Sequence, residues 1–62
     1  MEEVTFLKPK DVAKRLQMNI LTIYEYIRNG QLRASKFGRT YRISAQDLEL
    51  FVANHTINQV NN

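Results

Sequence analysis

The chain of 62 residues has no cysteine and no tryptophan, and only one proline, two glycines and one histidine. Without cysteine, neither a disulfide framework nor a cysteine-based zinc site can support so small a domain. One histidine makes neither a metal site nor a catalytic relay, and no glycine-rich loop is present to cradle a phosphate. We therefore expect a protein that is not an enzyme and that needs no cofactor, metal or small-molecule ligand.

Long apolar runs are also missing from the sequence. No stretch is long enough to span a membrane, and the first residues carry Glu2 and Glu3 instead of the basic start of a signal peptide. These features predict a cytoplasmic protein with no membrane partner.

The apolar residues that are present suffice for a compact fold. Leu, Ile, Val and Phe make up 18 of the 62 residues, above the roughly 20% below which a charged chain tends to stay disordered. A domain of this length buries only about 60% of its unfolded surface, so its stability is modest. We expect a single domain over residues 1–62, ordered from about residue 6 to residue 53, with a frayed asparagine-rich tail over 54–62.

The net charge of +3 is unevenly distributed along the chain. Segment 8–18 holds four basic residues and one acid, and segment 31–43 holds four basic residues and no acid. After Ile43 there are two acids, Asp47 and Glu49, and no Lys or Arg. Clustered Lys and Arg side chains suit a polyanionic partner, because they neutralise phosphates and release the counterions bound to them. The alternative is that these side chains only keep a small domain soluble.

Segment 19–30 has the pattern of a short helix with a packing face and a presented face. At about 100° per residue, one side gathers Ile20, Ile23, Tyr26 and Ile27, and the other gathers Leu21, Glu25 and Arg28, flanked by Thr22 and Tyr24. Asn19 is a suitable N-cap and Gly30 a suitable C-terminal stop. The presented face predicts a surface that enters a DNA groove.

An earlier helix is predicted over 9–17, since proline is favoured in a first helical turn and Val12, Ala13 and Leu16 form an apolar stripe. Only a tight connection separates it from Asn19, which is the pattern of a helix-turn-helix. Residues 1–7 are expected to be an extended or frayed lead-in whose Phe6 and Leu7 can pack on the core.

The chain after Gly30 changes from helical to strand-like periodicity. Two short runs around Gly38 predict a β-hairpin that leans on the helices through Phe37 and Ile43. Ser44 and Asp47 resemble a capping box that opens a third helix. Its apolar stripe is Leu48, Phe51 and Val52.

In this order, the segments DVAKRL, MN, TIYEYIRNGQL, KFGRTYRI and QDLELF resemble the excisionase-type DNA-binding domain, a winged helix-turn-helix related to MerR regulators. The resemblance covers about residues 6–52 and implies a mainly α fold with a small hairpin as its wing. It implies sequence-specific binding of double-stranded DNA, as an excisionase-like recombination factor or a small transcription regulator of bacterial, phage or mobile-element origin. It also implies that adjacent copies bind side by side on DNA.

Carried over to this chain, the resemblance makes residues 20–29 a recognition helix for the major groove and residues 34–43 a wing on the backbone or minor groove. The candidate DNA contacts are Leu21, Thr22, Tyr24, Glu25 and Arg28 in the recognition helix, Lys36, Arg39, Thr40 and Arg42 in the wing, and Lys10 in the first helix. The other reading of Arg42 is an ion pair with Asp11 or Asp47. Tyr26 is expected in the core and His55 at the surface.

Three residues depart from the family pattern. Gln17 replaces a glycine, so that the turn is either reshaped or holds a left-handed residue under strain. Lys8 replaces the usual Ser or Thr cap, which weakens the start of the first helix by about 0.5 to 2 kcal/mol. Glu25 stands where a basic residue is common, and it can accept from a cytosine amino group, position Arg28, or oppose phosphate.

Two other functions remain as alternatives to duplex binding. The first is a protein interaction module that uses the face of Leu21, Tyr24 and Arg28. The second is a single-strand or RNA binder, which the sequence disfavours because the aromatic residues are expected in the core and not on an exposed stacking surface.

Overall fold

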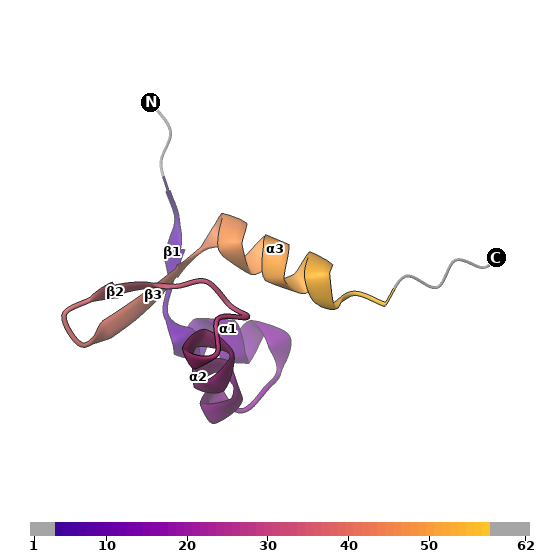
Figure 1. Cartoon of the computed structure of the whole chain (residues 1–62), viewed down its shortest axis with the longest axis horizontal. Coiled ribbons are helices and arrows are strands. Elements are labelled where there is room, and N and C mark those ends of the chain that lie inside the picture. Colours follow the sequence, from indigo (N-terminus) through magenta and orange to yellow (C-terminus); the bar gives the residue numbers. More distant parts are fainter. Residues whose placement is uncertain (1–3, 58–62) are drawn as a thin grey trace.

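The computed structural model describes residues 4–57 and has three helices and three short strands. In chain order they are β1 (Phe6–Leu7), α1 (Pro9–Leu16), α2 (Ile20–Arg28), β2 (Ser35–Phe37), β3 (Thr40–Ser44) and α3 (Ala45–His55). Figure 1 shows the hairpin of β2 and β3 projecting from the helices, with α1 and α2 below it and α3 leading away. The predicted winged helix-turn-helix is confirmed.

The core is formed where the three helices and β3 meet. Buried side chains come from every helix, from β3 and from the loop after α2, and they are Val12, Ala13, Ile23, Leu32, Ile43, Leu48 and Phe51. Most of the apolar positions at helical spacing in α1, α2 and α3 therefore lie on packing faces. Tyr26 is half-buried at the edge of this core, where its ring packs against the edge of Phe51 with 5.0 Å between centroids.

The helix starts follow from their capping residues. The side chain of Asn19 accepts a hydrogen bond from the backbone N–H of Leu21 at 2.8 Å, and Ser44 Oγ accepts from the backbone N–H of Asp47 at 3.0 Å. Both predicted caps are confirmed. The start of α1 is better supported than expected, since the carboxylate of Asp11 accepts from the backbone N–H of Lys8 at 3.2 Å.

Helices α1 and α2 end with the same hydrogen-bond pattern but with different residues in the left-handed position. After α1, Met18 N–H donates to the Ala13 carbonyl at 2.8 Å, and the intervening Gln17 has φ 56°. After α2, Gln31 N–H donates to the Tyr26 carbonyl at 2.9 Å around Gly30, whose φ is 82°. Both are Schellman endings. The turn of the helix-turn-helix thus keeps its shape and forces a residue with a Cβ into the left-handed region.

We predict that Gln17→Gly stabilises the domain by about 1 kcal/mol, because glycine occupies the left-handed region without the steric cost that glutamine bears there. For a domain of this size the melting temperature rises by about 4 to 8 °C per kcal/mol, which thermal unfolding followed by circular dichroism measures. Gln17→Ala, which keeps the Cβ, is the matched control and gives no such gain. A lower melting temperature for Gln17→Gly would mean that the turn carries no strain.

The sheet contains a strand that was not predicted. The lead-in before α1 forms β1, which pairs antiparallel with β3 so that Phe6 lies opposite Ser44 and Leu7 opposite Ile43. Ala45 N–H also donates to the Thr5 carbonyl at 2.8 Å. The strand order is β1-β3-β2, and the hairpin is thereby held by a third strand as well as by the helices.

Four expectations about packing are wrong. Neither Phe37 nor Phe6 packs against the core, since 57% of Phe37 and 45% of Phe6 are exposed. Val52 and Ile20 are also exposed and not packed, because each lies at the border of its helix's apolar stripe. Helix α3 continues to His55, past the residue 53 at which the ordered part was expected to end, and His55 Nδ1 lies 2.8 Å from the Phe51 carbonyl. Residues 58–62 of the predicted tail lie outside the described residues.

Candidate nucleic-acid interface

The presented face of α2 is exposed as the sequence predicts. Leu21 is 68% exposed, and Glu25 and Arg28 are exposed beside it, while Thr22 and Tyr24 are half-buried at the flanks. Ile23, on the opposite side, is fully buried and fixes the orientation of the helix. The helix thus offers side chains of three kinds (apolar, acidic and basic) along one surface.

The wing presents its basic residues around a tight turn. Gly38 has φ 66°, which allows the two-residue connection between β2 and β3. Lys36, Arg39 and Thr40 are exposed there, and Arg42 is half-buried. These four residues are the predicted wing contacts, and all of them lie on β2, on β3 or in the turn between them.

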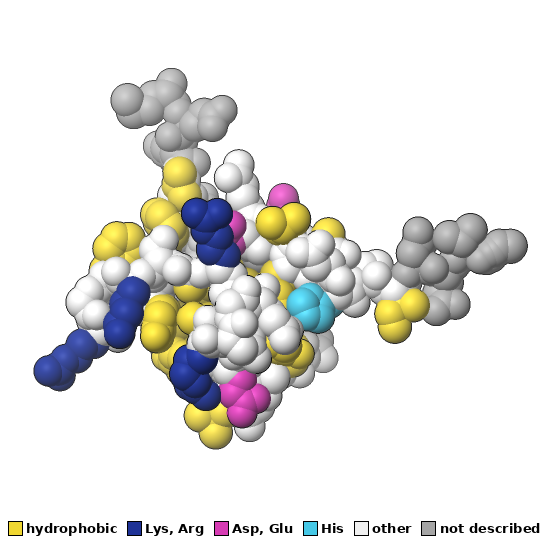
Figure 2. Space-filling model, in the orientation of Figure 1, with side chains coloured by type: hydrophobic (Ala, Val, Ile, Leu, Met, Phe, Trp, Pro, Cys, Tyr) yellow, Lys and Arg dark blue, Asp and Glu magenta, His cyan; other side chains and the backbone are white. Residues whose placement is uncertain are grey.

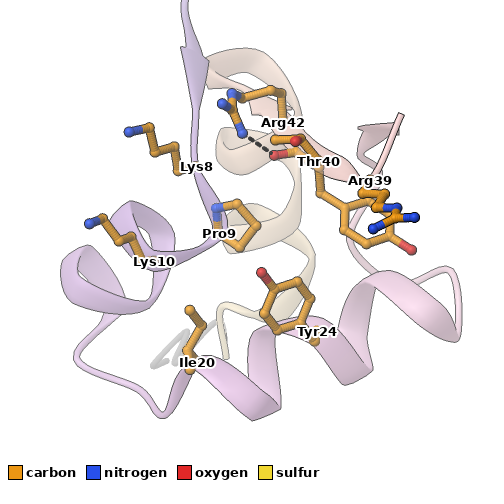
Figure 3. Close-up of a pocket in the computed structure, with 9 residues that line it drawn as sticks. Lys8, Pro9, Lys10, Ile20, Tyr24, Arg39, Thr40 and Arg42 are labelled. Atoms are coloured by element: carbon orange, nitrogen blue, oxygen red, sulfur yellow. Dashed lines mark hydrogen bonds between the residues drawn. The ribbon is translucent and has the colours of Figure 1, made fainter. Parts of the chain in front are cut away.

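A groove of about 400 Å³ joins the first helix, the recognition helix and the wing (Figure 3). Five of the ten predicted contact residues line it together, namely Lys10, Tyr24, Arg39, Thr40 and Arg42. The other lining residues were not predicted as contacts, namely Lys8, Pro9, Ile20 and Tyr41. Four of the described lining residues are Lys or Arg and none is an acid, so the groove is suited to an anion.

Two tyrosines connect the recognition helix to the wing. The rings of Tyr24 and Tyr41 lie with centroids 6.0 Å apart, and Lys36 Nζ lies 5.5 Å from the centroid of Tyr41. Tyr24 thus supports the relative placement of α2 and the wing in addition to lining the groove. Tyr41 lies two residues before the buried Ile43, on the same face of β3, but it is only half-buried because the hairpin projects past the core at this point.

Arg42 does not use its guanidinium for an ion pair with Asp11 or Asp47. One of its terminal nitrogens instead donates to the backbone carbonyl of its neighbour Tyr41 at 2.8 Å. A carbonyl neutralises no charge, so the full positive charge of Arg42 remains available to a ligand in the groove. The ion-pair alternative for this residue is wrong.

The remaining predicted contacts lie outside the groove. Leu21, Thr22, Glu25 and Arg28 follow the recognition helix, and Lys36 lies on the wing next to Tyr41. The candidate interface therefore has two parts, a cationic groove and an adjoining helix face. The mixed charges of Glu25 and Arg28 on that face suit discrimination between ligands better than they suit uniform attraction.

The distribution of charge over the molecule is one-sided. On the face drawn in Figure 2, Lys and Arg side chains lie over the half that carries the wing and the first two helices, while the far end of α3 shows none. The sequence has no Lys or Arg after Arg42. A polyanion would therefore approach from the wing side and not from the α3 side.

Comparison with known proteins agrees with this geometry. A family model described as a helix-turn-helix domain matches residues 6–56. No curated protein and no solved structure gives a significant match. Over residues 4–57, no helix is both long and apolar enough to cross a bilayer. Since the matched segment covers most of the chain and ends with α3, the protein belongs to the helix-turn-helix domain family, whose fold implies DNA as the partner.

Proposed function

We propose that this domain binds double-stranded DNA in a sequence-specific manner, with α2 in the major groove and the wing against the backbone or minor groove. One observation carries the proposal. The acid-free groove places cations from α1, the turn of the wing and β3 around the side of the recognition helix. A phosphodiester strand passing along the helix would meet these cations.

The dimensions of the recognition helix suit this role. Nine residues at about 1.5 Å per residue give a length of roughly 14 Å, comparable with the width of a B-form major groove. The exposed Leu21, Glu25 and Arg28 then face base edges, while Tyr24 and the wing cations face phosphates. Glu25 can accept from a cytosine amino group, and Arg28 can donate to guanine.

In this proposal, the whole chain acts as one non-catalytic, cytoplasmic DNA-binding unit. The resemblance to excisionase-type domains supports a role as a recombination directionality factor or a small transcription regulator. It also supports side-by-side binding of copies to repeated sites. The candidate contacts between copies are Ile57, which is exposed beyond α3, and Val60, which lies outside the described residues.

Selection from a random duplex pool tests this function. The domain is titrated into labelled duplexes at low and moderate salt, and the retained DNA is sequenced. The proposal expects salt-sensitive retention and an enriched motif, with a direct repeat if copies align side by side. If no DNA is retained even at low salt, the proposed function is overturned. A protein partner for the face of Leu21, Tyr24 and Arg28 is then favoured.

Once a preferred site is known, Arg28→Ala and Arg39→Ala separate base reading from phosphate binding. Arg28→Ala is expected to weaken the preferred site by about 1 to 3 kcal/mol while random duplex changes little. Arg39→Ala is expected to weaken binding to the preferred site and to random duplex by the same factor. It should also reduce the slope of log K against log salt by about 0.9. Competition binding at several salt concentrations measures both effects. Equal losses on both duplexes for Arg28→Ala would remove that residue from base reading.

A further inference from the structure

The outer face of the sheet carries two aromatic rings that lie outside the core. Residues opposite each other in antiparallel strands share a face, as do residues two apart in one strand. Phe6 lies opposite Ser44 and Phe37 lies opposite Thr40, so both phenylalanines are on the same face as alternate residues of β3. Ile43 points to the other face and is fully buried. Phe6 and Phe37 therefore lie on the face directed away from the core.

These two rings contact each other and remain accessible to solvent. Their centroids are 6.2 Å apart at an interplanar angle of 82°, an edge-to-face pair. Phe6 is 45% exposed and Phe37 is 57% exposed. Because each ring restrains the other, little side-chain freedom is left to be lost when a ligand binds. The pair is thus a preformed aromatic surface, contrary to the expectation that the aromatic residues are all needed in the core.

Cations and hydroxyl groups surround this aromatic pair. The register places Arg42, opposite Ser35, and Thr40 on the same face of the sheet. Arg39 lies in the turn that follows Phe37, and the whole segment 31–43 contains no acid. An apolar protein partner would leave these cations without counterions. A ligand that has flat aromatic groups joined by anions would match both features.

We propose that this aromatic face binds unpaired nucleotides, with a base stacked on Phe37 and the adjoining phosphates held by Arg39 and Arg42. Every nucleobase has a π face, so such stacking tolerates any sequence. Arg42 and Thr40 also line the groove beside the recognition helix, and the two surfaces are therefore continuous through β3. This site does not depend on duplex binding.

The test is fluorescence anisotropy of the full chain with a labelled oligothymidylate of about ten nucleotides, alongside a duplex of the same length. Phe37→Leu removes the aromatic face but keeps an apolar side chain on the strand. It is expected to weaken oligothymidylate binding about tenfold, within the range for loss of one stacked base. Its duplex affinity stays within about twofold of the unmodified chain, because the cations remain. Phe37→Tyr, which keeps a ring, retains oligothymidylate binding.

Leu50→Ala is the matched control. Leu50 is 60% exposed on α3, and its substitution removes no aromatic group. It should leave both affinities unchanged. A second readout reports stacking directly. A 2-aminopurine base within the oligonucleotide is expected to lose fluorescence on binding the unmodified chain and to keep it with Phe37→Leu.

Three results would overturn the proposal. The first is a lack of saturable oligothymidylate binding at low salt. The second is an equal effect of Phe37→Leu and Leu50→Ala. The third is a change of oligomeric state on Phe37→Leu with oligothymidylate binding intact, which would assign the face to a second protein chain. Loss of duplex binding alone contradicts only the duplex proposal, since the single-strand measurement is separate.

Discussion

The double substitution Arg39→Ala with Arg42→Ala is expected to lower the affinity for duplex DNA by a factor of at least about a hundred at low salt. Hydrogen bonds to charged groups contribute about 1.5 to 3 kcal/mol each, and two such contacts to phosphates are lost. Both side chains line the groove, and neither guanidinium is required by the core. The slope of log K against log salt should fall by about 1.8, or 0.9 for each phosphate.

The pair Lys14→Ala with Arg15→Ala provides a control of equal charge. Both residues are exposed near the end of α1 and line a separate surface with Leu7 and Asp11, away from the groove. If net charge alone attracts DNA, the two double variants weaken binding equally. If the groove is the contact, the control loses much less affinity. Equal losses would contradict the interface described above.

Ile23→Ala is expected to unfold the domain or bring it close to unfolding at 25 °C. Ile23 is fully buried where α2 meets the rest of the core, and truncating a buried isoleucine to alanine costs about 2 to 5 kcal/mol. A 62-residue domain has a total stability of roughly 3 to 9 kcal/mol, so that a single cavity removes a large share. The measurement is urea unfolding followed by circular dichroism.

Leu21→Ala is the control for this variant, because Leu21 lies two residues away on the same helix and is largely exposed. Its stability should change by less than about 0.5 kcal/mol. Comparable losses for the two variants would mean that α2 does not present one face and bury the other. The pair thus tests the orientation of the recognition helix by stability alone.

The helical part of the fold is well predicted by the sequence because its signals are local. Asn19, Ser44 and Gly30 act through hydrogen bonds and backbone angles within a few residues, and the apolar stripes of α1 and α2 follow the helical period. The strained Gln17 was also foreseen as one of two outcomes, since the turn length leaves little room for another backbone path.

The sheet is less predictable because its contacts join distant parts of the chain. Strand β1 is two residues long, too short for alternation to show, and it exists because β3 offers a pairing edge. The position of Phe37 depends on the same pairing. With β1 in place, the ring of Phe6 packs against the ring of Phe37. Phe37 therefore has an aromatic partner on the outer face of the sheet and does not pack against the helices.

The candidate contact residues are named from the sequence, but their division between a groove and a helix face emerges only from the structure. Charge and helix periodicity identify Lys10, Arg39 and Arg42, but no sequence pattern shows that they converge on one groove. Tyr41 was missed because a residue on the inner face of a strand is expected to be core, whereas the hairpin extends past the core at this point. Ile20 was not expected to line the groove because helical periodicity places it on the packing face of α2, but at the first turn of that helix it is exposed to the groove.

The most direct test of the central claim is a nuclear magnetic resonance titration of the isotope-labelled chain with duplex DNA. If the groove and the exposed face of α2 form the interface, backbone amide shifts should change most in segments 8–10, 20–28 and 36–42 and little along α3 from residue 45 to 55. Changes confined to α3 and the neighbouring surface of Leu16 and Met18, or no changes at low salt, would contradict the assignment of this face to DNA.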